Sequence, residues 1–151
     1  MLNIEKPYYK FEASPDALVF EFESVSEKEI IKKIVVYEAV ENYKNIFQLG
    51  FGNLTKEGGI DFVALSKNKD RDKVLATVAQ TMLIFFEQYP TKKIYFTGSD
   101  EIRTRFYRSI FSKFIEIIEL YFEVIGLGLD GKREKFIENK AYKGFIIYEP
   151  V

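Results

Sequence analysis

Hydrophobic and polar positions alternate with a period of two across residues 17–66. In residues 17–24 (ALVFEFES), Leu18, Phe20 and Phe22 occupy every second position, which is the pattern of a strand with one buried face. Three further apolar segments follow, separated only by short polar stretches, at residues 29–40, 43–51 and 59–66. Connections this short permit only hairpins, so the pattern predicts four strands in an antiparallel meander.

The period changes from two to 3.6 at Asn68, which predicts a helix. From Asp70 to Tyr89 the apolar residues follow one stripe, and Pro90 ends the predicted helix because proline cannot continue the backbone hydrogen bonding. The stripe comprises Val74, Leu75, Val78, Met82, Phe85, Phe86 and Tyr89.

The second half of the chain predicts one more helix between short strands. Residues 92–97 (KKIYFT) predict a strand, and a helix is expected from Gly98 to about Tyr121. Residues 122–129 predict another strand that leads into an Asp-Gly turn, and residues 144–150 predict the last one. The stripe of this helix contains Ile102, Phe106, Ile110, Phe114, Ile117 and Tyr121.

This order of elements predicts an α+β fold, in which an antiparallel four-strand meander is continued by β-α-β-α-β-β. Two long helices are expected to pack on one face of a mixed sheet. The chain has no repeat or linker, so residues 1–151 are expected to form a single domain. Some strands are apolar on both faces, as with Ile34 and Val36 against Val35 and Tyr37. We therefore expect the second sheet face to meet another subunit, which predicts a homodimer.

The composition narrows the chemistry that is available to the protein. The absence of Cys and His excludes disulfides and thiolate nucleophiles, and it removes the commonest general base and transition-metal ligand. We expect no metal and no cofactor, and an enzyme is less expected than a binding protein. The net charge of −1 means that any nucleic-acid site must be local. With no membrane-spanning run and no signal segment, the expected location is the cytoplasm.

Two arginines lie on the inward faces of the predicted helices. On a wheel of ~100° per residue, Arg71 and Arg103 each lie within the apolar stripe, in the first turn. If the preceding strands are parallel, both helix N-termini lie at the end of the sheet where ligand crevices form. An anion site would combine these arginines with Lys73 and with the backbone N–H groups after Gly98 and Ser99.

The same arginines also have a structural interpretation. Asp70 and Asp72 flank Arg71, and acids in a first turn are typical of helix capping. An ion pair between Arg103 and one of these aspartates would explain an inward arginine without a ligand. Arg105 lies on the outer side of its helix, where it is a candidate for helical ion pairs. The ion pair is the simpler interpretation, and the anion site stays open as the alternative.

Aromatic residues on the predicted strands also have two interpretations. Phe47, Phe51, Tyr43 and Tyr95 could stack bases on a sheet, as RNA-binding sheets do. In a chain with 15 Phe and 10 Tyr, however, most rings must belong to the hydrophobic core. Core packing is therefore the favoured interpretation.

Two segments, residues 68–81 (NKDRDKVLATVAQT) and 97–111 (TGSDEIRTRFYRSIF), resemble the signature of an uncharacterised family of bacterial, Bacteroidetes-type single-domain proteins. The closing GFIIY is similar to the C-terminal strand of that family. The chain departs from the family pattern at Lys69, Asp100 and Ile102, and the extra acid at Asp100 weakens the case for an anion site. The resemblance implies no activity. The matching positions are Asp70, Asp72, Lys73, Val74, Leu75, Ala76, Thr77, Val78, Ala79, Gly98, Ser99, Arg103, Thr104, Arg105 and Tyr107.

The sequence thus favours an uncharacterised, non-enzymatic interaction module, a homodimer with a protein or nucleic-acid partner. The alternative is a small-anion or nucleotide-binding domain that uses the N-termini of the two helices. The two hypotheses differ in whether Arg71 and Arg103 are paired with carboxylates or open to a pocket.

Overall fold

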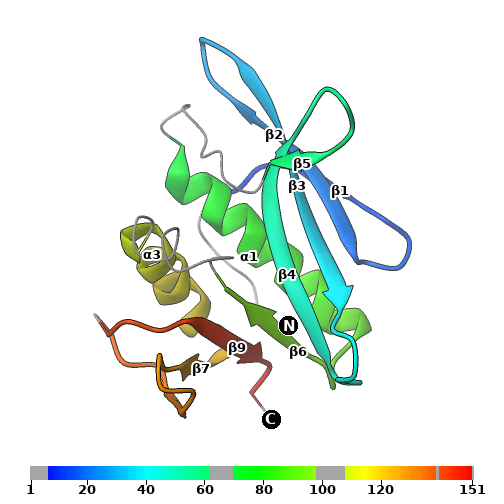
Figure 1. The fold of residues 1–151 in the computed structure, drawn as a ribbon. Coiled ribbons are helices and arrows are strands. Elements are labelled where there is room, and N and C mark those ends of the chain that lie inside the picture. The colour runs from blue at the N-terminus through cyan, green and yellow to red at the C-terminus, as the bar shows by residue number, and fades with distance from the viewer. Residues whose placement is uncertain (1–6, 62–69, 98–107, 139, 151) are drawn as a thin grey trace. The chain divides into compact units, whose positions relative to one another are not determined.

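The computed structural model describes residues 7–61, 70–97, 108–138 and 140–150 (Figure 1). The chain forms two compact units: unit 1 comprises residues 1–38 and 50–90, and unit 2 comprises residues 39–49 and 91–151. Strand β4 (Ile46–Leu54) begins in unit 2 and ends in unit 1. The single domain expected for residues 1–151 stays a prediction.

Unit 1 contains a sheet with the strand order β1-β2-β3-β4, and β5 pairs with the end of β4. The β1/β2, β2/β3 and β4/β5 pairs are antiparallel. In β2, Phe20 and Phe22 are buried whereas Glu21 and Glu23 are exposed, so the period of two predicted for this segment is confirmed. Besides β4, the strands are β1 (Phe11–Ala13), β2 (Val19–Val25), β3 (Ile30–Ala39) and β5 (Ile60–Asp61).

Helix α1 (Arg71–Gln88) packs on β3 through its apolar stripe (Figure 1). The ring of Phe85 stacks on that of Tyr37, with 4.6 Å between the centroids. The Tyr37 hydroxyl also shares a buried hydrogen bond of 2.8 Å with the hydroxyl of Thr81. Phe85 is 0% exposed, so its predicted place in the core is confirmed.

Unit 2 contains a sheet with the strand order β4-β6-β9-β7-β8. Strand β4 is parallel to β6, and the remaining pairs are antiparallel. Helix α3 (Arg108–Glu119) packs on one face of this sheet, where the Phe114 ring meets the Phe96 ring edge-on at 5.4 Å. Phe114 is 0% exposed, which confirms its predicted core position. The strands are β6 (Lys93–Phe96), β7 (Glu123–Leu127), β8 (Arg133–Lys135) and β9 (Gly144–Tyr148).

The predicted fold class is wrong. The structure is mostly sheet, with nine strands among the described residues and only two helices there, of 18 and 12 residues. It is not a sheet with two long helices packed on one face. The four predicted strands of the meander correspond to β2, β3, β4 and β5, which are neighbours in that order, and the β2/β3 and β4/β5 pairs are antiparallel. The prediction missed that β4 also pairs in parallel with β6. Strand β8 was not predicted, since its charged sequence Arg-Glu-Lys lacks the apolar alternation that marks a strand with a buried face.

Candidate functional site

Most of the predicted anion site falls outside the described residues. This applies to Gly98, Ser99 and Arg103, and also to the side chain of Arg71, the first residue of α1. Arg105, a candidate for ion pairs only, lies outside the described residues as well. Both the anion site and the ion pair of Arg103 therefore stay predictions.

Asp70, one of the predicted ion-pair candidates, occupies the N-cap position of α1 without capping it. Its side chain makes no cap hydrogen bond. Instead, the hydroxyls of Tyr9 and Ser24 each donate to its Oδ2, at 2.5 Å. This carboxylate thus links the start of α1 to β2 and to the segment that precedes β1, whereas Asp72 is exposed on the helix.

The two lysines near Asp70 are engaged with neighbouring side chains. Lys73, a predicted anion ligand, places its Nζ 4.1 Å from the centroid of the Tyr9 ring in a cation–π contact. Lys33, which the sequence analysis missed, is 4% exposed and donates to Oδ1 of Asn53. Burial lowers the pKa of Lys33, and the charge of Asp70 acts in the opposite direction. Lys33 lies two and four positions before Val35 and Tyr37, so on a strand it points to the same side as these residues. This alternation could have revealed that Lys33 is buried.

These contacts form a polar cluster of unit 1 that ties the first turns of α1 to the sheet. Within the described part of the chain, no buried side-chain nitrogen or oxygen lacks a hydrogen-bond partner. A cluster in which every buried polar group is bonded needs no ligand to be stable. We therefore assign the cluster a structural role.

A second group of charged and aromatic side chains lies in unit 2, on the sheet face opposite α3. Ile94, Val124 and Ile147 are buried on the α3 side, so the alternation of side chains along each strand directs their neighbours to the other side. We call this other side the outer face. It carries Lys93 and Tyr95 on β6, Ile146 and Tyr148 on β9, Ile125 on β7, and Arg133 and Lys135 on β8.

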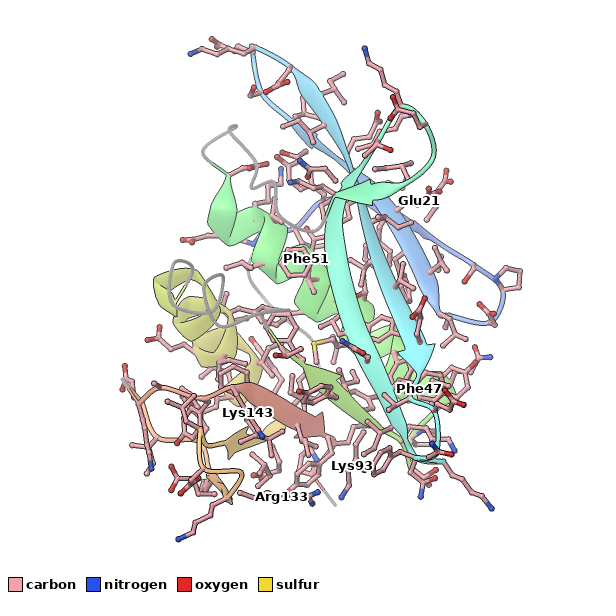
Figure 2. The ribbon with its side chains drawn as sticks, in the orientation of Figure 1. Glu21, Phe47, Phe51, Lys93, Arg133 and Lys143 are labelled. Carbon is pink, nitrogen blue, oxygen red and sulfur yellow. The ribbon has the colours of Figure 1, made fainter. Side chains whose placement is uncertain are left out.

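The outer face contains a shallow depression of about 310 Å³. Its floor is apolar, because Ile125 and Ile146 lie directly opposite each other in the register. Cations line it from both sides: Lys93 from β6, and Arg133 and Lys135 from β8, all three exposed. Figure 2 shows Lys93 and Arg133 at this part of unit 2.

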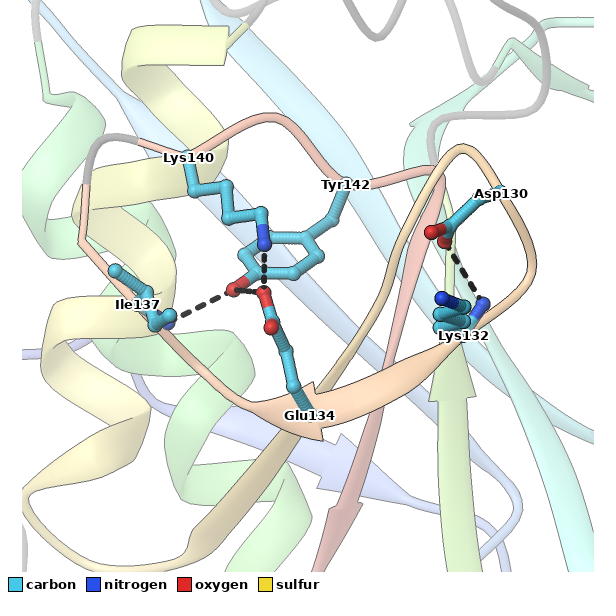
Figure 3. A network of polar contacts seen from close by, with 6 residues as sticks. All are labelled: Asp130, Lys132, Glu134, Ile137, Lys140 and Tyr142. Carbon is cyan, nitrogen blue, oxygen red and sulfur yellow. Dashed lines mark hydrogen bonds and ion pairs between the residues drawn. The ribbon is translucent and has the colours of Figure 1, made fainter.

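The acid in the depression's lining, Glu134, is held by groups on the opposite side of β8 (Figure 3). The Tyr142 hydroxyl donates to Glu134 Oε1 at 2.7 Å, and Lys140 Nζ lies 2.5 Å from the same oxygen. The hydrogen bond from Lys140 holds the pKa of Glu134 below its usual value, and the one from Tyr142 adds to this. Glu123, at the far end of β7, has the parity of the outer face and is exposed.

Two tyrosine rings complete the outer face. Lys93 Nζ lies over the Tyr148 ring, 5.3 Å from the ring centroid. The Tyr95 ring lies against β9 at Gly144, where an added Cβ would come within 2.9 Å of its Cε1. A glycine is thus needed there for the ring to approach the strand this closely. Tyr95 was among the predicted base-stacking candidates, whereas Tyr148 was not.

The sequence analysis missed the cations of the outer face for a topological reason. In a strand over Arg133–Lys135, Glu134 points to the opposite side from its two neighbours. The sequence pattern does not indicate which of the two sides is the outer face of the sheet. The strand order β6-β9-β7-β8 is also not the order along the chain. It brings Lys93 and Arg133 to the same depression, although they are 40 positions apart in the sequence.

The described residues give no sign of two other kinds of site. They contain no group of three or more acidic side chains placed to hold a metal ion. None of the helices among them is long and apolar enough to cross a membrane.

A family model described as a family of unknown function, DUF6934, matches residues 5–150, and the chain belongs to this family. The resemblance to an uncharacterised family is thereby confirmed, whereas the specific signature and a Bacteroidetes-type origin stay predictions. Neither the curated proteins nor the solved structures gave a match to the chain.

Proposed function

We propose that this member of DUF6934 is a non-enzymatic interaction module that binds a polyanion on the outer face of unit 2. One observation carries the proposal: Lys93, Arg133 and Lys135 gather around one apolar depression, while Glu134 is held by Lys140 and Tyr142. Exposed cations around an apolar floor attract phosphate or carboxylate groups. The free-energy cost of desolvating these cations on binding is small, because each loses water on one side only.

The charges of the two units support the same proposal. Unit 2 carries 12 Lys and Arg against 10 Asp and Glu, a net +2, whereas unit 1 carries 10 against 13, a net −3. The whole-chain charge of −1 hides this asymmetry. An anionic partner is therefore drawn to unit 2 rather than to the chain as a whole.

The predicted homodimer would compete for the same face. In a two-fold dimer through the outer face, the same patch of both copies meets, so the three cations of one copy would face those of the other. Like charges brought together in this way oppose association. We therefore propose a polyanion on the outer face. The homodimer through the second sheet face stays an untested prediction, as does the bacterial, cytoplasmic location.

The test measures binding of fluorescein-labelled heparin by fluorescence anisotropy. The variant carries Lys93→Glu, Arg133→Glu and Lys135→Glu together, and we expect at least a 10-fold loss of affinity at low salt. Since the three side chains are exposed, the variant should retain the wild-type melting temperature.

A matched control reverses three exposed lysines of unit 1, Lys10, Lys28 and Lys56. It has the same net charge as the first variant, so it separates a local site from a general charge effect. Equal losses in the two variants would contradict the proposal. Conversely, Glu123→Gln removes the exposed acid of the outer face and should strengthen binding.

A further inference from the structure

We infer that the polyanion is single-stranded nucleic acid, and that two of its bases stack on Tyr95 and Tyr148. This inference rests on the proposed function, since it names the partner of the same face. It is carried by Tyr148, which lines the depression together with the three cations, and by Tyr95, which lies on the same sheet face.

The rings lie on adjacent strands in the middle of the unit 2 sheet. Tyr95 on β6 is directly opposite Ile146 on β9, and Tyr148 is two positions further along β9, on the same side. Such diagonal neighbours lie about 7–8 Å apart. The Tyr95 ring lies toward Gly144, on the side away from Tyr148, so the two rings are further apart than these backbone positions. Separate rings on neighbouring strands can each receive one base of an extended strand, which is how sheet surfaces bind single-stranded RNA.

Tyr95 lies on the outer face and is partly exposed, so it is not a fully buried core residue. Its ring lies against the backbone of β9 because Gly144 has no side chain, with Tyr95 Cε1 only 2.9 Å from where a Cβ would be. An edge of the ring is therefore turned to the sheet, and the residue remains partly exposed. Ile146 and Ile125 continue this apolar surface toward β8.

The cations lie where the phosphates of such a strand would run. Lys93 lies over the Tyr148 ring, and Arg133 and Lys135 lie at the other edge of the depression, on β8. A strand that crosses from β6 to β8 would place bases over the rings and isoleucines, with phosphates near the cations at both edges. This combination of aromatic platform and basic border is typical of sequence-tolerant single-strand binding.

Other anionic partners fit the outer face less well. A duplex keeps its bases paired and offers no free ring to stack on Tyr95 or Tyr148. Inorganic polyphosphate matches the cations but gains nothing from the rings. A second copy of the chain would bring like charges together.

The experiment compares three probes on the full-length chain by fluorescence anisotropy and competition. They are a fluorescein-labelled ten-nucleotide oligothymidylate, the same oligonucleotide in a duplex, and unlabelled inorganic polyphosphate of similar length. We expect the single strand to bind best. With three cations engaged, the logarithm of its binding constant should fall with the logarithm of the salt concentration with a slope of about −2.

Variants of the rings separate stacking from charge. Tyr95→Leu and Tyr148→Leu should each weaken binding of the oligothymidylate by about 5-fold to 100-fold, since stacking contributes that much per base. Neither should change the competition by polyphosphate. Tyr→Phe at the same positions keeps the ring and should retain affinity, even if a Leu variant folds poorly. Tyr43→Leu, at a tyrosine of unit 2 that is 60% exposed and lies outside the outer face, is the matched control.

The outcomes distinguish the inference from the proposed function. If polyphosphate and oligothymidylate bind alike and the Leu variants have no effect, the inference is wrong and the polyanion site stands. If no polyanion binds, both are wrong. A stable dimer whose formation protects Tyr95 and Tyr148 from solvent would also overturn both, because a second copy would then occupy the outer face.

Discussion

Gly126, on β7, gives the sharpest test of the packing in unit 2. The Tyr142 ring lies directly against this residue, so that a Cβ added at Gly126 would come within 2.6 Å of Cδ1 and of Cζ. Tyr142 is 3% exposed, and its hydroxyl accepts a hydrogen bond from the Ile137 N–H at 3.0 Å and donates one to Glu134 at 2.7 Å. Gly126→Ala must therefore displace a buried ring that is held by two hydrogen bonds.

The size of the effect follows from these contacts. Overpacking of a buried site costs roughly 1–3 kcal/mol, and each hydrogen bond lost with the displaced ring costs about 1 kcal/mol. Replacing glycine by alanine in a strand returns roughly 0.5–1 kcal/mol of chain entropy. We expect a net loss of about 2–4 kcal/mol, or roughly 4–16 °C in melting temperature for a chain of this length.

Urea denaturation followed by circular dichroism measures this loss, with Gly128→Ala as the matched control. A Cβ at Gly128 would approach Asp130 Oδ1 at 2.7 Å, but that oxygen belongs to an exposed side chain that can turn away. The carboxylate would give up one hydrogen bond, to the Lys132 N–H, so the control should cost less than about 1 kcal/mol.

A double-mutant cycle with Tyr142→Leu tests the cause. Without the ring, Gly126→Ala should cost less than about 1 kcal/mol, which gives a coupling of about 2 kcal/mol between the two positions. An equal cost of Gly126→Ala in both backgrounds would refute the assigned contact, as would an equal cost of the Gly128 control.

Three further predictions concern the core and the charged groups. Phe85→Ala and Phe114→Ala should each lower the free energy of unfolding by roughly 3–5 kcal/mol, since both rings are buried; unchanged urea midpoints would contradict this. Glu134 has a lowered pKa, so its ionised form stabilises the fold above the usual pKa of Glu, and this contribution disappears as the pH falls through the lower pKa of the folded state. Glu134→Gln should therefore be less stable than wild type at pH 7, with the difference vanishing well below about pH 4. Lys33 has a pKa lowered by burial, so between that value and the usual one of about 10.4 the unfolded chain binds more protons and stability rises with pH. The stability of wild type relative to Lys33→Met should thus increase from pH 7 to pH 9.5, and a constant difference would show that the Lys33 pKa is not lowered.

Features that repeat at short range along the chain could be predicted before the structure was known. The period of two around Phe20 and Phe22 and the helical positions of Phe85 and Phe114 follow from residues only two to four positions apart, and their burial is confirmed. Such patterns indicate which side of a helix or strand is buried, because each buried position by itself favours an apolar side chain.

The arrangement of the strands, in contrast, became known only from the fold. The last strand, β9, lies between β6 and β7. Strand β4 pairs in parallel with β6, although α1 separates the two strands in the sequence. The sequence analysis joined only neighbours in the chain, so it predicted the order of β2 to β5 but neither of these two features. Strand order depends on backbone hydrogen bonds between distant segments, and these bonds leave no periodic trace in side-chain polarity.

The outer face shows the same division. Once β8 is known to be a strand, alternation places Arg133 and Lys135 on one side of it and Glu134 on the other, but the sequence did not predict this strand. That these cations share a depression with Lys93 and Tyr148 follows from the pairing of β6 with β9, of β9 with β7 and of β7 with β8. A local pattern cannot supply this proximity, because the register of each pair is set by the summed packing of whole strands rather than by any single residue.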